Sequence, residues 1–345
     1  MNIIFFSANM QNYKSANYQR EFMNELNKKN KIFFYGPGFH NYDKYDDLDK
    51  IIKKSKFNND LVLFVGHSWL SDDTNNIENL AINNNLSFDE THLFKVIFLN
   101  KEYVNLKHKL EYIKKNKFNV AFTHHHETSV YEKKTNTKFV QIPFAYSEEI
   151  LEMKSNLVNK KFYDVCFTGI LQNQNKKSFQ SDIRLRIMKL FFHCLFDIPI
   201  IKKKKFKNIK IYWNTIPRFK IGKIIKKIFF KNLNNDEYIE ILQLSKISIN
   251  TLSPISLISP RFFESAACNC YILCEESSLY ADIFNDYQLF EFKKDLSDFE
   301  TKLFELINKK ENANTIKDHE FFLNNHSWKN RVNKVIDSIK KFRNV

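Results

Sequence analysis

The chain is poor in glycine, with five among 345 residues, and this scarcity excludes the common glycine-rich phosphate loops. Neither a Walker A loop nor a Gly-x-Gly-x-x-Gly fingerprint is present. No apolar run reaches the roughly 18 residues of a membrane span, and no basic segment precedes the first apolar run as in a signal peptide. The five cysteines are an odd number, which argues against a disulfide framework and predicts reduced thiols. These absences favour a cytoplasmic protein.

What the chain does contain is a globular mixture with an excess of positive charge. Apolar residues make up 43% and charged residues 27%, which separates the chain from disordered sequences. Lys and Arg number 54 against 39 Asp and Glu, giving a formal charge of +15. Lys, Asn, Ile and Phe are the residues of AT-rich codons, so part of this charge reflects base composition. The length suits two domains.

Short apolar runs alternate with amphipathic stretches along the whole chain, and the pattern restarts after a polar segment at 154–161. Such alternation predicts parallel sheets covered by helices on both faces. We therefore expect an α/β protein with two doubly wound, Rossmann-like domains, 1–153 and 154–345, facing a central cleft. The predicted strands are 2–7, 31–35, 60–65, 95–99, 119–122, 138–142, 163–167, 209–213, 246–250, 270–274 and 288–292, and the predicted helices include 17–27, 183–195, 298–308 and 329–342.

Three of the glycines, Gly36, Gly66 and Gly169, directly follow predicted strands. Ligands of open α/β sheets bind at the carboxyl ends of the strands, and a residue without Cβ lets the backbone approach a ligand closely. The alternative is that these glycines serve tight turns from strand to helix. Both interpretations stay open for each glycine.

The most informative segment runs from residue 256 to residue 275. Ser259 followed by Pro260 predicts a helix start, and Asn269 is suited to the left-handed conformation at its end. Arg261 and Glu264 then lie in the first turns, where helix amides favour a diphosphate. Arg261 adds a cation, and the Glu264 carboxylate can accept hydrogen bonds from a vicinal diol such as that of ribose. The alternative is a surface arginine and a carboxylate that complements the helix dipole.

The sequence Arg-Phe-Phe-Glu-Ser-Ala-Ala-Cys-Asn at 261–269 resembles the Arg-x-Phe-Glu-Ala-x-Ala-Cys-Gly signature of bacterial GT-B glycosyltransferases. The resemblance is to the family-one-like group that includes spore-maturation enzymes. Tyr-Asp-Val-Cys-Phe-Thr-Gly at 163–169 and His-Ser-Trp-Lys-Asn-Arg at 326–331 resemble further motifs of the group, in the same order. The likeness extends over nearly the whole chain and is specific in its C-terminal half.

This resemblance implies a GT-B fold whose C-terminal domain holds a nucleoside-diphosphate sugar and whose N-terminal domain holds the acceptor. Glu264 would take the ribose hydroxyls, Gly169 would let the backbone approach the donor phosphates, and Arg184 or Arg186 would pair with those phosphates. Many relatives carry an acidic residue where this chain has Ser256, eight positions before Glu264. No cofactor and no metal site are expected, because Arg261, a helix N-terminus and nearby cations suffice to stabilise a departing nucleoside diphosphate.

Candidates for a catalytic base lie in loops of the first domain. They are His67 and two members of the run at 124–126, His124 and His126, because an unperturbed imidazole titrates close to neutral pH. Gly36 and His40 are the candidates for acceptor binding. The alternative is that these loop histidines are only solvated polar groups.

A basic block without acidic residues lies between Asp197 and Asp236. Within it, 218–231 has the pattern of an amphipathic helix with lysines opposite an apolar face. Such a helix suits peripheral contact with an anionic inner membrane face, with a gain of roughly 1 kcal/mol per cation. An ordinary surface helix is the alternative.

The sequence predicts a glycosyltransferase that moves a sugar from a nucleoside diphosphate to a hydroxyl of a surface glycan or lipid-linked acceptor. A second hypothesis is a basic nucleic-acid-binding protein, suggested by the charge of +15 and by aromatic residues among the lysines. The concentration of cations in one block ranks it lower, so no nucleic-acid partner is expected. A third is a non-catalytic GT-B protein, which Ser256 favours.

Overall fold

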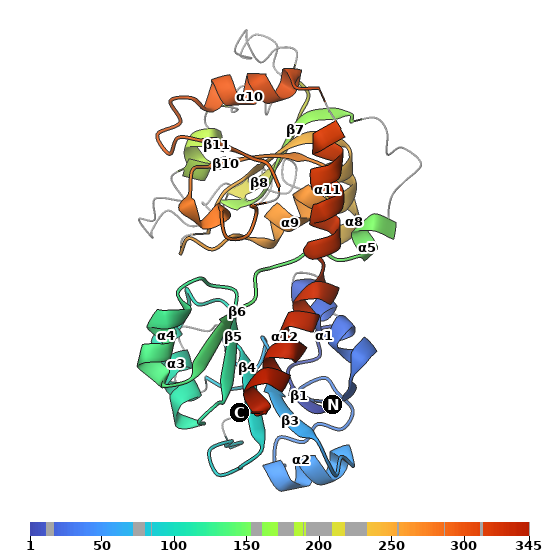
Figure 1. The fold of residues 1–345 in the computed structure, drawn as a ribbon, viewed down its shortest axis with the longest axis vertical. Coiled ribbons are helices and arrows are strands. Elements are labelled where there is room, and N and C mark those ends of the chain that lie inside the picture. Colours follow the sequence, from blue (N-terminus) through green and yellow to red (C-terminus); the bar gives the residue numbers. More distant parts are fainter. Residues whose placement is uncertain are drawn as a thin grey trace. The chain divides into compact units, whose positions relative to one another are not determined.

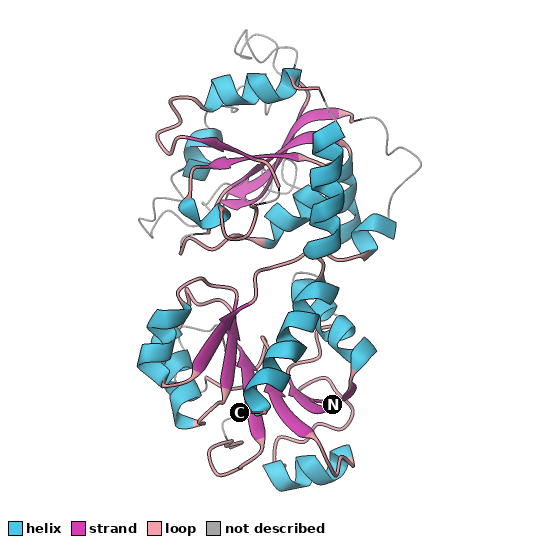
Figure 2. Cartoon of the chain, in the orientation of Figure 1, coloured by secondary structure: helices cyan, strands magenta, loops and turns pink. Residues whose placement is uncertain are grey.

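The computed structural model describes residues 1–11, 17–71, 80–83, 85–152, 161–171, 183–188, 190, 209–217, 233–253, 255–285, 287–310 and 313–344. The chain forms two compact units (Figure 1). Unit 1 contains Met1–Phe144 and Trp328–Val345, and unit 2 contains Ala145–Ser327. In each unit the strands lie at the centre and helices surround them (Figure 2).

Unit 1 is built on a six-stranded sheet in which every paired strand is parallel. The strand order is β2-β1-β3-β4-β5-β6. The sequence predictions for these strands are confirmed to within two residues at each end. The strands are β1 (Asn2–Phe6), β2 (Lys31–Tyr35), β3 (Leu61–Val65), β4 (Phe94–Phe98), β5 (Val120–Thr123) and β6 (Lys138–Gln141).

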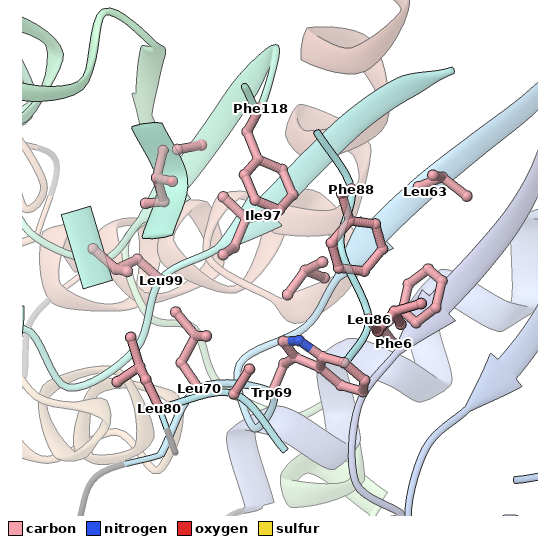
Figure 3. Packing of buried hydrophobic residues seen from close by; sticks show 14 of the residues in the cluster. Phe6, Leu63, Trp69, Leu70, Leu80, Leu86, Phe88, Ile97, Leu99 and Phe118 are labelled. Carbon is pink, nitrogen blue, oxygen red and sulfur yellow. The ribbon is translucent and has the colours of Figure 1, made fainter. Parts of the chain in front are cut away.

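One face of this sheet packs on α2 (Leu48–Ser55), α3 (Leu106–Lys115) and α4 (Thr128–Thr135). Figure 3 shows the core on this face. The ring of Phe6 lies edge-on to Trp69, with centroids 5.6 Å apart, and to Phe88, at 4.9 Å (Figure 3). Aromatic pairs in this geometry add to the stabilisation that comes from burial alone.

Side chains alternate between the two faces of a sheet along each strand. On the opposite face of this sheet they form a layer of phenylalanines. The ring centroid of Phe64 in β3 lies 5.0 Å from that of Phe5 in β1 and 6.1 Å from that of Phe122 in β5. Phe22 of α1 (Asn17–Lys29) covers this layer, with its ring 5.9 Å from Phe64 and 5.3 Å from Phe98. The helix α12 (Trp328–Arg343) packs against α1 and β5, so both faces of the sheet are covered.

Unit 2 repeats the design with a five-stranded parallel sheet in the order β11-β10-β9-β7-β8. The strands are β7 (Tyr163–Leu171), β8 (Ile211–Pro217), β9 (Ser245–Asn250), β10 (Tyr271–Glu275) and β11 (Leu289–Phe292). A helix at 183–188 and α10 (Phe299–Asn308) share one core with the sheet. The other helices include α9 (Pro260–Ala267), which contacts β9 and β10, and its neighbours α5 (Glu149–Glu152), α8 (Asn235–Gln243) and α11 (Ala313–Asn325).

Both sheets place their second strand outside the first and their third strand on its other side. This arrangement confirms the predicted pair of doubly wound α/β units. In such sheets the chain leaves the first and third strands in opposite directions, and ligands bind at the carboxyl ends of those two strands. The expected site in unit 2 therefore lies where β7 and β9 end.

The predicted helix start at Ser259 is confirmed: Pro260 is the first helical residue of α9, and Asn269 adopts the left-handed conformation with φ 55°. Ser259 holds the N-cap position, but its side chain accepts no capping hydrogen bond. The α9 boundaries follow from local chemistry, because proline is suited to the first turn and asparagine tolerates positive φ.

The domain boundary differs from the predicted break between residues 153 and 154. Residues from Ala145 onward belong to unit 2, and Trp328–Val345 returns to unit 1. The apolar stripe of α12, which includes the buried Val332 and Val335, explains the return because α1 and β5 cover it. Helical periodicity predicts such a stripe but does not say which sheet will bury it.

The predicted basic helix at 218–231 and its membrane contact lie outside the described residues, as do residues 191–195 of the predicted helix 183–195. In the parts of the chain that the structure describes, no helix combines the length and the apolar character needed to span a membrane. Cys166, Cys268, Cys270 and Cys274 are buried free thiols.

Replacing Trp328 by alanine should destabilise unit 1 by about 3 to 5 kcal/mol, because the side chain is buried against Phe22 and His124. Urea unfolding of Trp328→Ala measures this loss. The neighbouring Lys329→Ala, on the exposed side of α12, is the control and should stay within about 0.5 kcal/mol. Equal stabilities for the two variants would contradict the packing of α12 on unit 1.

Candidate functional site

Two guanidinium groups meet close to the carboxyl ends of β7 and β9, near the position that the strand order predicts: Thr168 lies inside β7, and Thr251 directly follows β9. Arg184 donates from Nη2 to the carbonyl oxygen of Thr168 at 2.9 Å, and Arg261 donates from Nη1 to the same oxygen at 2.5 Å. Arg184 also donates from Nη1 to Oγ1 of Thr251, directly after β9, at 3.3 Å. Two like charges are therefore neighbours on one backbone acceptor.

Arg184 is an unusual cation because it is only 6% exposed. Its guanidinium lies over the ring of Phe167 at 5.1 Å, and its Nε has no hydrogen-bond partner among the described residues. Burial, and then the proximity of Arg261, hold the pKa of Arg184 well below its usual value. An anion bound here would relieve both effects, since it supplies opposite charge and hydrogen-bond acceptors.

Glu275, the last residue of β10, is a buried carboxylate with 1% exposure. It interacts electrostatically with Arg184. Its Oε1 accepts a hydrogen bond from the backbone N–H of Leu252 at 2.8 Å, and its Oε2 is without a partner in the described part of the chain. Burial raises the pKa of Glu275, and Arg184 opposes that rise. Sequence reasoning missed this residue, although an acidic side chain directly after the apolar run 270–274 was a visible signal.

Glu264 lies one helical turn after Arg261 on α9 and is partly buried. Tyr238 of α8 donates from Oη to Glu264 Oε2 at 3.0 Å. Burial raises the pKa of Glu264, while the Tyr238 hydrogen bond and Arg261 lower it. The structure thus brings Arg261, Glu264 and Arg184 to one end of the unit 2 sheet. Tyr238 was missed, because nothing local in the sequence marks its partner 26 residues away.

The remaining predicted donor residues are placed differently. Arg186 donates to the carbonyl oxygens of Lys294 and Asp295 after β11, so its guanidinium is engaged away from Thr168. Gly169 does not follow the strand as predicted but lies inside β7, where it pairs with Thr215. The strand continues because its neighbour β8 extends the hydrogen-bonded ladder to Leu171.

Ser256 lies in the loop between β9 and α9 with φ 59°, in the left-handed region. The loop closes on itself, with the N–H of Ser253 donating to the Leu257 carbonyl at 3.0 Å and the N–H of Ser256 donating to the Ser253 carbonyl at 2.9 Å. Glu275 holds the start of this loop through Leu252. The Glu275 carboxylate of β10 therefore contacts the start of the loop in which Ser256 lies.

A pocket of about 600 Å³ opens beside this region, next to the carboxyl ends of β10 and β11. Its lining mixes carboxylate, hydroxyl and aromatic groups and includes Glu276, Ser277, Tyr280, Glu291 and Lys294. The two guanidinium groups and Glu264 are not among its lining residues. The converging charges, and not this pocket, therefore define the candidate site.

In unit 1, His67 and His124 follow β3 and β5 and are almost completely buried, at 4% and 2% exposure. Their rings stack with centroids 5.4 Å apart, and Phe98 of the intervening strand lies 4.0 Å from His67 and 4.8 Å from His124. His124 donates from Nδ1 to the carbonyl oxygen of Ile142 at 2.8 Å, since a carbonyl can only accept. Burial lowers the pKa of His67 well below its usual value and that of His124 to about 3.

The other predicted unit 1 residues do not join this buried pair. His126 is exposed and stacks on His125, with ring centroids 4.3 Å apart, and His40 is exposed in the loop after β2. Gly36 has φ 149°, and a Cβ there would lie 2.1 Å from the carbonyl oxygen of Ser7. The packing of the chain against itself thus requires this glycine.

Comparison with known proteins agrees with the fold. Residues 203–337 match a protein family described as glycosyl transferase-like. That region contains Tyr238, Arg261, Glu264 and Glu275. No curated protein sequence matches significantly.

Several solved structures resemble the whole chain. An E. coli structure described as trehalose-6-phosphate bound with UDP-2-fluoro glucose has a TM-score of 0.61 at 9% identity, covering 99% of both chains. Anabaena HepE in complex with UDP and glucose has a TM-score of 0.56 at 7% identity, also covering 99% of both. An alpha-glucosyltransferase in complex with UDP and a 13-mer DNA has a TM-score of 0.55 at 12% identity, covering 98% of this chain and 99% of its own.

At such identities the structural likeness establishes the fold, which is the GT-B arrangement of two parallel-sheet α/β units. Together with the glycosyl transferase-like match it indicates a glycosyltransferase.

Acidification should destabilise unit 1 through its two buried histidines. In the unfolded chain an imidazole takes up a proton below about pH 6.5, whereas the folded protein resists this because the pKa values of His67 and His124 are lowered. The stabilisation is therefore complete above pH 6.5 and is lost as pH falls toward 3, by up to about 1.4 kcal/mol per pH unit for each histidine.

The variant His67→Phe removes one titrating group and keeps an aromatic ring among aromatic neighbours. Free energies of unfolding from urea titrations at pH 7, 6 and 5 should fall less steeply for this variant than for the unchanged protein. His40→Gln, at an exposed position, should show the unchanged slope. Identical slopes for all three proteins would show that His67 does not stay neutral in the folded state.

Proposed function

We propose that the protein transfers a sugar from a nucleoside-diphosphate sugar, bound by unit 2, to a hydroxyl group of an acceptor bound by unit 1. The observation that carries the proposal is the meeting of Arg184 and Arg261 on the Thr168 carbonyl, with Glu264 one turn along α9. The finer assignment to the spore-maturation-type group rests on the 261–269 signature and on the motifs at 163–169 and 326–331.

Each part of the donor has a matching group in unit 2. The two guanidinium groups and the first amides of α9 suit a diphosphate, because cations and helix N-termini both stabilise phosphate oxygens. The Glu264 carboxylate suits the ribose hydroxyls, which donate hydrogen bonds. Gly169 adds a position without a side chain directly after Thr168, so a phosphate could lie close to the backbone.

The chemical step needs stabilisation of the departing nucleoside diphosphate. As the bond between the sugar and the phosphate breaks, negative charge grows on the phosphate oxygens. Arg184 and Arg261 are already oriented by hydrogen bonds to fixed backbone and side-chain atoms, so little reorganisation is required when this charge develops. Arg186 would contribute less, since its guanidinium is held by carbonyl oxygens after β11.

The acceptor hydroxyl needs a general base to take up its proton. The burial of each histidine decides how well it suits this role. A general base works best with a pKa near the working pH, and a pKa of about 3 makes His124 a poor one. His67 shares the same burial. We therefore assign the base to the exposed His126 ahead of His67 and His124, and acceptor contact to the loop that carries Gly36 and His40.

A surface glycan or a lipid-linked glycan is the acceptor class that we propose. Both acceptors offer hydroxyl groups at the inner membrane face. The net positive charge of the protein would attract the anionic lipids there. The peripheral membrane contact through 218–231 is part of this proposal.

Nucleotide binding should depend on Arg261 and not on Arg186. Both arginines are partly buried in unit 2 and donate to backbone carbonyls, so they form a matched pair. Isothermal titration with UDP, GDP and ADP should give binding that Arg261→Ala weakens by about 10- to 100-fold, because a charge-assisted hydrogen bond is lost. Arg186→Ala should bind within about threefold of the unchanged protein. Absence of binding to all three nucleotides would refute the proposed function.

A nucleic-acid acceptor is the second candidate, favoured by the net charge of +15 and by the structural likeness to an alpha-glucosyltransferase in complex with DNA. Binding to phosphate backbones releases counterions, so affinity for a duplex should fall at least about tenfold between 50 and 200 mM salt. Fluorescence anisotropy with a labelled 13-mer duplex measures this. Weak binding that salt does not change would remove nucleic acid as the acceptor.

A further inference from the structure

The hydroxyl of Tyr238 links α8 to α9 through the carboxylate of Glu264, with Oη 3.0 Å from Oε2. The helix α8 is held firmly at its start, where Asn234 and Glu237 cap each other at 2.9 and 3.1 Å. Ile239 and Leu242 bury its inner face. Tyr238 therefore donates from a helix that is capped and packed on the unit 2 core, and such support helps to orient a partner side chain.

The direction of this hydrogen bond follows from the two groups that share it. Burial and the adjacent carboxylate raise the pKa of Tyr238 well above its usual value, so the phenol keeps its proton and donates it. Burial raises the pKa of Glu264, and the same bond and Arg261 oppose that rise. The phenol thus donates to the Glu264 carboxylate and holds its rotamer.

This arrangement leaves acceptors and no donor for a ligand. Tyr238 has used its one proton, so its oxygen can only accept further bonds, and the carboxylate oxygens of Glu264 can only accept. A ribose offers two O–H donors, at its 2′ and 3′ positions, to such a pair. A 2′-deoxyribose lacks one of them and would leave a desolvated acceptor unpaired, which sites built for hydroxyl groups reject strongly.

We infer that Tyr238 is a positioning residue that orients Glu264 toward the ribose and makes the site prefer ribonucleotides to 2′-deoxyribonucleotides. This inference rests on the proposed function, because it assumes that a nucleoside diphosphate binds at Arg184 and Arg261. Tyr238 acts through Glu264.

The test compares ribose with 2′-deoxyribose in Tyr238→Phe, which keeps the ring and removes the hydroxyl. Isothermal titration is run with UDP and 2′-deoxy-UDP, and with GDP and 2′-deoxy-GDP. The unchanged protein should bind the ribose form at least about tenfold more tightly. In Tyr238→Phe the ribose form should lose about tenfold and the deoxy form much less, so the preference falls by at least threefold.

Two further variants separate orientation from stability. Tyr287→Phe also removes a tyrosine hydrogen bond in unit 2, the one to the Cys270 carbonyl at 2.9 Å, and should keep the ribose preference. Glu264→Gln should lose the preference by itself, and adding Tyr238→Phe to it should cause little further loss, because both changes break one interaction.

The outcomes distinguish the inference from the function beneath it. If Tyr238→Phe weakens both sugar forms equally, or leaves the ribose preference intact, the positioning role is overturned while nucleotide binding stands. If the two variants act additively, Tyr238 does not work through Glu264, and the inference again fails. If the unchanged protein binds no nucleotide, the proposed function itself is overturned.

Discussion

The meeting of two guanidinium groups on one carbonyl oxygen is the constraint on which the site depends. Arg184 and Arg261 come from different helices and both reach the Thr168 carbonyl. Burial disfavours the charged form of Arg184 and the neighbouring Arg261 repels it, so both hold the pKa of Arg184 below its usual value. Glu275 offsets part of this cost. An anion bound next to the two guanidinium groups would stabilise their charged forms, so the arrangement favours anion binding.

The two sheets share one strand order, yet the chemistry at their carboxyl ends differs. In unit 2, Thr251 directly follows β9 and Glu275 ends β10, and Arg184 reaches Thr251 from the helix at 183–188. In unit 1 the corresponding end holds His67 and His124 in a stack of aromatic rings, both electrically neutral because burial lowers their pKa. A shared topology therefore supports charged and hydroxyl-bearing groups at one end and a buried aromatic stack at the other.

Local patterns predicted much of the fold, and long-range contacts account for what they missed. The strands, the start of α9 at Pro260 and the left-handed Asn269 follow from apolar runs and residue geometry, which act over a few neighbours. The partner of Tyr238, the buried Glu275 and the return of α12 to unit 1 depend on residues far away in the sequence. From the sequence, Arg184 and Arg186 were equal candidates for binding the donor phosphates. They differ only in their distant contacts, which are Thr168 for Arg184 and Lys294 and Asp295 for Arg186.

The histidines show why residue type alone does not identify a base. His67, His124 and His126 carry the same imidazole, whose ordinary pKa suits proton transfer near neutral pH. The first two end buried strands, and the aromatic layer that stabilises unit 1 also removes the water that would solvate their charged forms. His126 lies only two positions after His124 but outside that layer. The packing that builds the core thus decides which of these three identical groups are buried and which one is exposed.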